Sequence, residues 1–124
     1  MRSGAQAYGT IAKQVASPRE LESDLLLNAA SRLQTIRDNW DGTKHQLDAA
    51  LLYNRQLWMI FVDSMSADDN PLPVEVRQNV ANLGIFVFKQ TLATLADPKA
   101  EKLDSLIRIN RELAAGLIGN PTDL

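Results

Sequence analysis

Few side chains in this sequence have the types and spacing that catalysis needs. His45 is the only histidine, and it lies beside Lys44 near a predicted helix start. A metal site would need further ligands, and a catalytic triad would need a nucleophile and a third member. Neither pattern accompanies this histidine. A surface histidine is therefore favoured over a metal ligand or a general base.

The acidic residues are also explained without chemistry. Asp68-Asp69-Asn70 offers oxygen ligands, but a calcium loop needs acidic residues at alternating positions, a glycine and a distant glutamate. A solvated turn is favoured there. Glu20, Glu22 and Asp24 fall in the first turns of a predicted helix, where the helix dipole favours acids. Cysteine is absent, as are glycine-rich phosphate loops. We therefore predict no catalytic residue, no metal site and no cofactor, and a protein that is not an enzyme.

Composition and charge narrow the remaining classes. The chain has 124 residues, 45% of them hydrophobic and 23% charged, which is typical of one globular domain. The net charge is −2 and basic residues do not cluster, so direct nucleic-acid binding is disfavoured. No apolar run approaches the roughly 18–20 residues that cross a bilayer. The N-terminus lacks a signal peptide's pattern. These features predict a cytoplasmic protein without membrane insertion.

The stretch 53–89 carries most of the aromatic residues and predicts two helices around a loop at 66–73. The first has an apolar seam at helical period, formed by Leu47, Leu51, Asn54, Trp58, Phe61 and Met65. The second runs to about Ala96. Its segment from Leu83 to Phe88 is apolar nearly all round and is compatible with a strand when taken alone. We predict a helix because the segment lies within a longer helical pattern and no partner strand exists.

Further helices are predicted before and after this stretch. A short one begins at Ala5, and a longer one, capped by Ser17, is expected to end at Asp41-Gly42 with a left-handed glycine. The last is expected to start at Asp97-Pro98 and to stop at Gly119. The predicted fold is all-α: a single-domain bundle of four main helices plus a short N-terminal helix. The domain covers residues 5–119, and residues 1–4 and 120–124 are expected to be frayed.

The seam and the apolar hexapeptide supply the candidate partner-binding residues. Asn54 either fixes helix register through an internal hydrogen bond, the favoured interpretation, or bonds a partner. Aromatic residues at helical spacing are mostly core, yet a small bundle cannot easily cover every side of residues 83–88, and an exposed apolar patch is typical of a partner site. Alternatively, all these residues are internal and function lies on polar loops. The candidate set is Asn54, Trp58, Phe61, Ile85, Phe86 and Phe88.

These same segments resemble a known family. The elements are Asn54-Arg55-x-Leu57-Trp58-x-x-Phe61, Leu72-Pro73, Val76-Arg77 and Asn82-Leu83-Gly84-x-Phe86-Val87. Their order and spacing resemble the flagellar biosynthesis regulator FlaF of alphaproteobacteria. The Ala7-Tyr8 opening, the Ser17-Pro18-Arg19-Glu20 start and the segment from Leu106 to Leu117 fit as well. The resemblance covers the chain from about Ala7 to Gly119.

The resemblance implies a small, non-enzymatic cytoplasmic factor that promotes flagellin synthesis and secretion. A chaperone-like role in which it binds flagellin is the favoured version, since a helical partner with an apolar groove could shield flagellin's amphipathic ends. The alternative is a regulator of flagellin translation that acts through the repressor FlbT and binds flagellin weakly. Direct RNA binding ranks last because of the charge. A homodimer is compatible with an exposed apolar face.

Overall fold

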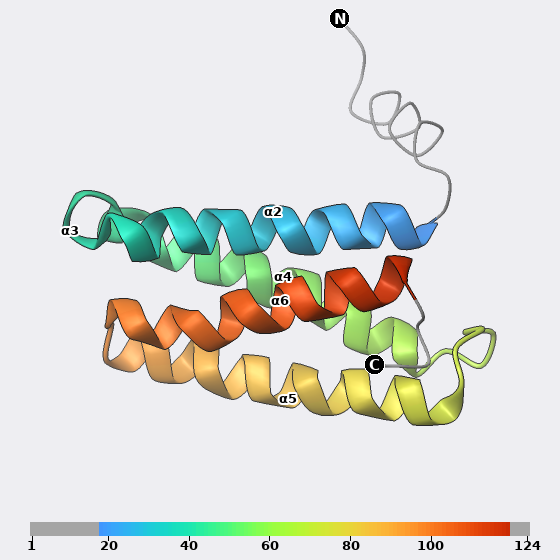
Figure 1. Ribbon diagram of the computed structural model, residues 1–124. Coiled ribbons are helices and arrows are strands. Elements are labelled where there is room, and N and C mark those ends of the chain that lie inside the picture. The colour runs from blue at the N-terminus through green and yellow to red at the C-terminus, as the bar shows by residue number, and fades with distance from the viewer. Residues whose placement is uncertain (1–17, 120–124) are drawn as a thin grey trace, which may run out of the picture.

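The computed structural model describes residues 18–119. Four long helices lie side by side, each antiparallel to the next along the chain (Figure 1). They are α2 (Pro18–Asp38), α4 (Leu47–Met65), α5 (Val74–Ala96) and α6 (Asp104–Ile118). Three short elements join them: α3 (Trp40–Thr43), η1 (Lys44–Gln46) and η2 (Ala100–Leu103). The described residues contain no strand, so the predicted all-α bundle of four main helices is confirmed. The short helix expected from Ala5, its neighbour's Ser17 cap and the frayed ends lie outside the described residues.

The seam predicted for α4 forms the centre of the core. All six of its residues are buried, and Leu57 and Ala50 join them. The segment 83–88 is helical throughout, as predicted, and the loop at 66–73 separates α4 from α5. Thus the apolar period of 3.6 residues, more than the β-branched composition of residues 83–88, indicated the local structure.

Small buried side chains lie on the two helices that contact each other most. α2 packs most closely against α6, and small buried side chains line both helices: Ser23, Ala29 and Ala30 on α2 and Ala114 on α6. α5 packs chiefly against α4 and makes few contacts with α6. Its buried residues are Val76, Val80, Gly84, Val87, Thr91 and Thr94. α5 is therefore the helix with the most uncovered surface.

The predicted end of α2 is wrong. α2 ends at Asp38, and Asp41-Gly42 belongs to α3, where Gly42 has no left-handed backbone. Thr43 makes the glycine cap unnecessary, because its hydroxyl donates to the carbonyl oxygens of Asn39 at 2.6 Å and Ile36 at 3.4 Å. These hydrogen bonds supply donors to carbonyl oxygens near the end of α2, which in a glycine-based cap would accept hydrogen bonds from backbone amides.

The predicted start of the last helix is also wrong. The amide of Asp97 donates to the carbonyl oxygen of Ala93, so Asp97 ends α5 instead of opening α6. The next turn is η2, and α6 begins only at Asp104. Lys102 explains the difference, because its ammonium group donates to Ala93 O and Asp97 Oδ2, each at 3.3 Å. That side chain holds η2 against the end of α5, and Leu103 is buried in the core.

An ion pair joins the end of α2 to the start of α6. From this pair we predict that the stability of the fold depends slightly on pH. Arg37 Nε donates to Asp104 Oδ1 at 2.6 Å, and this hydrogen bond holds the pKa of Asp104 below its usual value. Because the pKa of Asp104 is lower in the folded state than in the unfolded state, its ionised form stabilises the fold at pH values above about 4. This contribution to stability is lost as the pH falls through the folded-state pKa. Asp104→Asn should therefore be less stable than the natural chain at neutral pH, by a small amount because both side chains are partly exposed.

Urea unfolding followed from pH 7 towards about pH 2 checks this prediction. The stability difference between the natural chain and Asp104→Asn should shrink to nothing in acid. Asp48→Asn is the matched control, because Asp48 also lies in the first turn of its helix and shares the dipole effect. A difference for Asp104→Asn that does not change with pH would contradict the assigned role of the Arg37 pair.

Candidate interaction surface

The six candidate residues divide sharply by burial. Trp58 and Asn54 are 0% exposed and Phe61 is 4% exposed, so all three lie inside the bundle. They present no surface to a partner while the described fold is intact. By contrast, Ile85 is 51% and Phe86 42% exposed. Phe88 is partly buried and packs against the core. The exposed part of the candidate set therefore lies on α5 alone.

A buried hydrogen-bond network accounts for Asn54 and Trp58. The indole Nε1 of Trp58 donates to Asn110 Oδ1 at 2.8 Å. The Asn110 amide in turn donates to Asn54 Oδ1 at 2.7 Å and to the carbonyl oxygen of Leu26 at 3.4 Å. This network links α4, α6 and α2 through the middle of the core. The internal interpretation of Asn54 is therefore the one that the structure favours.

Asn110 is a residue whose role the sequence reasoning missed. It is 0% exposed and makes more hydrogen bonds than either of its two partners in the network. A signal was present in the sequence, because Asn110 stands at helical spacing between Leu106 and Leu113, as Asn54 does within its own seam. Two asparagines within apolar seams suggest a pair that meets across a core.

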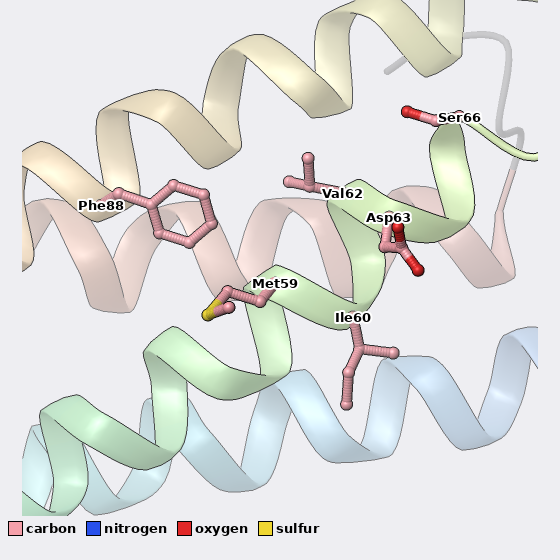
Figure 2. A pocket seen from close by; sticks show the side chains of 6 residues that line it. All are labelled: Met59, Ile60, Val62, Asp63, Ser66 and Phe88. Atoms are coloured by element: carbon pink, nitrogen blue, oxygen red, sulfur yellow. The ribbon is translucent and has the colours of Figure 1, made fainter.

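A hollow of about 460 Å³ lies between α4 and α5 on the outer surface. Its lining comes mostly from α4, with one aromatic ring from α5. Figure 2 shows the Phe88 ring extending from α5 toward Val62 and Met59 of α4, while Ile60 points away from the ring. Two polar residues, Asp63 and Ser66, complete the lining. The hollow is thus mainly apolar, with one acid.

Exposed apolar side chains extend the hollow along both helices. On α5, Ile85, Phe88, Leu92 and Leu95 are spaced three, four and three residues apart and so share one flank. Leu92 is 64% exposed and Leu95 42%. On α4, Leu52 stands seven residues before Met59 and shares its face. We call the hollow together with Leu52, Ile85, Leu92 and Leu95 the apolar flank. From Ile85 to Leu95 it runs about 15 Å along α5.

Phe86 does not belong to the apolar flank. It is exposed, but residues two apart on a helix point to nearly opposite sides, and Phe86 is absent from the hollow's lining. Five residues of the hexapeptide 83–88 therefore face three different directions in the structure. Gly84 and Val87 face the core, Ile85 and Phe88 face the apolar flank, and Phe86 faces away from both.

The described residues were also compared with the requirements of a metal site and of a membrane span. Within residues 18–119, no group of three His, Cys, Asp or Glu side chains is placed to hold a metal ion. His45 is exposed, as expected. Over the same residues, none of the helices combines the length and the apolar character that a membrane span requires. Asp63 and Ser66 can supply an anion and a hydroxyl at the rim of the hollow, which suits recognition of another apolar surface.

The fold and this surface define a small antiparallel helical bundle with an apolar groove between two neighbouring helices. A family model for the flagellar protein FlaF matches residues 4–117. The chain therefore belongs to the FlaF family of flagellar proteins, which confirms the resemblance. Searches of curated proteins and of solved structures each found no match.

Proposed function

We propose that this FlaF protein is a non-enzymatic factor that binds flagellin and so promotes its synthesis and secretion. The observation that supports the proposal most strongly is the apolar flank. Contiguous apolar surface on a soluble bundle is typical of a protein-binding site. A groove between two antiparallel helices suits an amphipathic helix, whose residues at spacings of three and four enter such a groove. In this proposal a flagellin helix lies along α5, between Ile85 and Leu95.

The proposal gives the candidate residues different roles. Trp58, Phe61 and Asn54 hold α4 in position from within the core, and their side chains do not touch flagellin. Phe88, Met59 and Val62 form the floor and wall of the binding site. The exposed leucines and Ile85 extend the contact on either side.

Charge substitution on the apolar flank tests this role. Leu92→Asp and Met59→Asp each place a carboxylate at an exposed position, 64% and 49% exposed respectively, so the bundle should stay folded. Desolvating that carboxylate against an apolar helix should weaken flagellin binding by at least about tenfold. Binding of the purified full chain to purified flagellin, measured by titration calorimetry, gives the affinity. Circular dichroism confirms that each variant is folded.

Phe86→Asp is the matched control, because it introduces the same charge on the opposite side of the same helix at a comparable exposure. It should bind flagellin as the natural chain does. Loss of binding in Phe86→Asp but not in Leu92→Asp would contradict the assigned surface. Absence of flagellin binding in the natural chain would refute the proposed function, and tight binding of FlbT in a parallel titration would then favour the alternative regulator.

A further inference from the structure

We propose that a second copy of this chain covers the apolar flank, in an antiparallel dimer whose two-fold axis crosses α4 and α5 at Met59 and Phe88, and that flagellin displaces this copy. The dimer does not depend on the identity of any other partner. Its displacement rests on the proposed function, since it assumes that flagellin uses the same surface.

The exposed apolar stripe of α5 repeats as in a coiled coil. Its residues are spaced four, three, four and three apart: Ala81, Ile85, Phe88, Leu92 and Leu95. This spacing is the heptad repeat by which one helix packs lengthwise against another helix. The core of the bundle uses a different face of α5, which carries Val80, Gly84 and Val87. The stripe is therefore a second packing face, and the helices within residues 18–119 leave most of it exposed.

Two opposite charges on α4 lie beside this stripe, and they are placed symmetrically about Met59. Arg55 precedes Met59 by four residues and Asp63 follows it by four, so both share its face of α4, about 6 Å to either side. Both side chains are exposed, and among residues 18–119 neither has an ion-pair partner. A surface with one base and one acid at equal distances from its centre is complementary to itself after a half-turn.

One two-fold axis aligns α4 and α5 with their copies at the same time. The Phe88 ring extends toward Met59 across the hollow, so these two residues lie at the same level of the bundle (Figure 2). An axis that crosses both helices at this level stacks each helix on its own copy in the reversed direction. Asp63 of each chain then faces Arg55 of the second copy. The dimer therefore gains two ion pairs that a single chain cannot make.

The same axis brings apolar side chains together along α5. Ile85 precedes Phe88 by three residues and Leu92 follows it by four, so Ile85 of each chain faces Leu92 of the second copy. These side chains are 51% and 64% exposed in the single chain, and the dimer covers them. Lys89 is the one charged residue of α5 between them. It lies at the edge of the stripe, where water and salt screen its charge.

Exchange of the two charges tests the dimer and its register. Sedimentation equilibrium of the natural chain at about 100 μM should give the mass of a dimer. Asp63→Arg or Arg55→Glu should each weaken dimerisation at least about tenfold, because each variant sets like charges against each other twice. Glu112→Arg is the matched control, since it makes the same change as Asp63→Arg at an exposed position of α6 and should dimerise as the natural chain does.

A mixture of the two variants gives the decisive result. In a heterodimer of Asp63→Arg with Arg55→Glu, both contacts again join an acid to a base, so the equimolar mixture should dimerise although neither variant does alone. Circular dichroism confirms that each variant is folded. A monomeric natural chain would overturn the proposal. Single variants as dimeric as the control, or a mixture no more dimeric than its components, would overturn it as well.

Light scattering on mixtures with purified flagellin tests the displacement. Flagellin should convert the dimer into a complex that contains one copy of each protein, because the two partners compete for one surface. A complex that keeps two copies of this chain would overturn the displacement. The two proposals fail separately. A dimer that binds no flagellin refutes the proposed function and leaves the dimer standing, whereas flagellin binding by a monomeric natural chain refutes only the dimer.

Discussion

Replacing Asn110 by leucine is expected to lower the free energy of unfolding by about 3–5 kcal/mol. The substitution puts an apolar side chain of similar size in place of the amide and deletes every hydrogen bond that Asn110 makes in the network. Trp58 Nε1 loses its acceptor, and Asn54 Oδ1 loses its donor. Both side chains are 0% exposed, so water cannot replace the lost partner. Each unsatisfied buried group costs about 1–3 kcal/mol.

Urea unfolding of a double-mutant cycle measures the central bond. Trp58→Phe removes the indole donor, so the pair Trp58→Phe and Asn110→Leu should be less destabilising than the sum of the two single variants. We expect a coupling energy of about 1–2 kcal/mol. Asn28→Leu, at an exposed position of α2, is the control and should stay within about 0.5 kcal/mol of the natural chain. Strict additivity would show that the Trp58–Asn110 bond contributes nothing.

The two asparagines should not be equivalent. Asn54 accepts one hydrogen bond, and its Nδ2 has no hydrogen-bond partner among the described residues. Asn54→Leu removes that unpaired donor along with the acceptor, and Asn110 Nδ2 keeps the carbonyl oxygen of Leu26. Asn54→Leu should therefore cost clearly less than Asn110→Leu in the same urea experiment. The reverse order would show that Asn54 is the central member of the network.

The effect of Gly84→Ala on the free energy of unfolding should change sign when the side chain of Val62 is shortened. A methyl group added at Gly84 would overlap Cγ2 of Val62 across the α4–α5 interface. The overlap should cost about 1–3 kcal/mol, because a valine in a helix has one strongly preferred rotamer and cannot easily turn aside. Better helix propensity recovers about 1 kcal/mol of that cost. Gly84→Ala is thus expected to be destabilising by up to about 2 kcal/mol in the natural background.

In a Val62→Ala background the overlapping methyl is gone, and Gly84→Ala should become stabilising by up to about 1 kcal/mol. Thermal or urea unfolding of the four variants gives the sign directly. Under the proposed function, Gly84→Ala alone should also weaken flagellin binding, because Val62 lines the hollow and α5 would shift away from α4. A substitution that destabilises equally in both backgrounds would show that the close approach of α4 and α5 is not what requires glycine here.

Much of the fold follows from local patterns in the sequence. The α4 seam was predicted residue by residue, and the helical character of residues 83–88 followed from the longer pattern around them. A period of 3.6 residues is a property of the chain itself and needs no knowledge of neighbours. Helix ends were predicted less well. At Gly42 and Asp97 the decisive hydrogen bonds come from the side chains of Thr43 and Lys102, which local cap motifs did not reveal.

The candidate partner-binding residues could be predicted from the sequence only in part. Six residues were selected because they are aromatic, apolar or unexpectedly polar within apolar segments. The structure buries Trp58, Phe61 and Asn54 and leaves Ile85 and Phe86 exposed on different sides of α5. Met59 and Val62, which line the hollow beside Phe88, were not selected, because nothing in their own segment separates them from ordinary core residues.

Local patterns in the sequence were enough to predict the amphipathic helices, the position of most of them and the family resemblance. Which of several apolar faces became core depended on how the helices pack together. An apolar residue is buried or exposed according to what packs over it, and α5 makes few contacts with α6 while its other flank stays uncovered beside α4. That uncovered flank is a property of the whole bundle, because it depends on how four helices share one core.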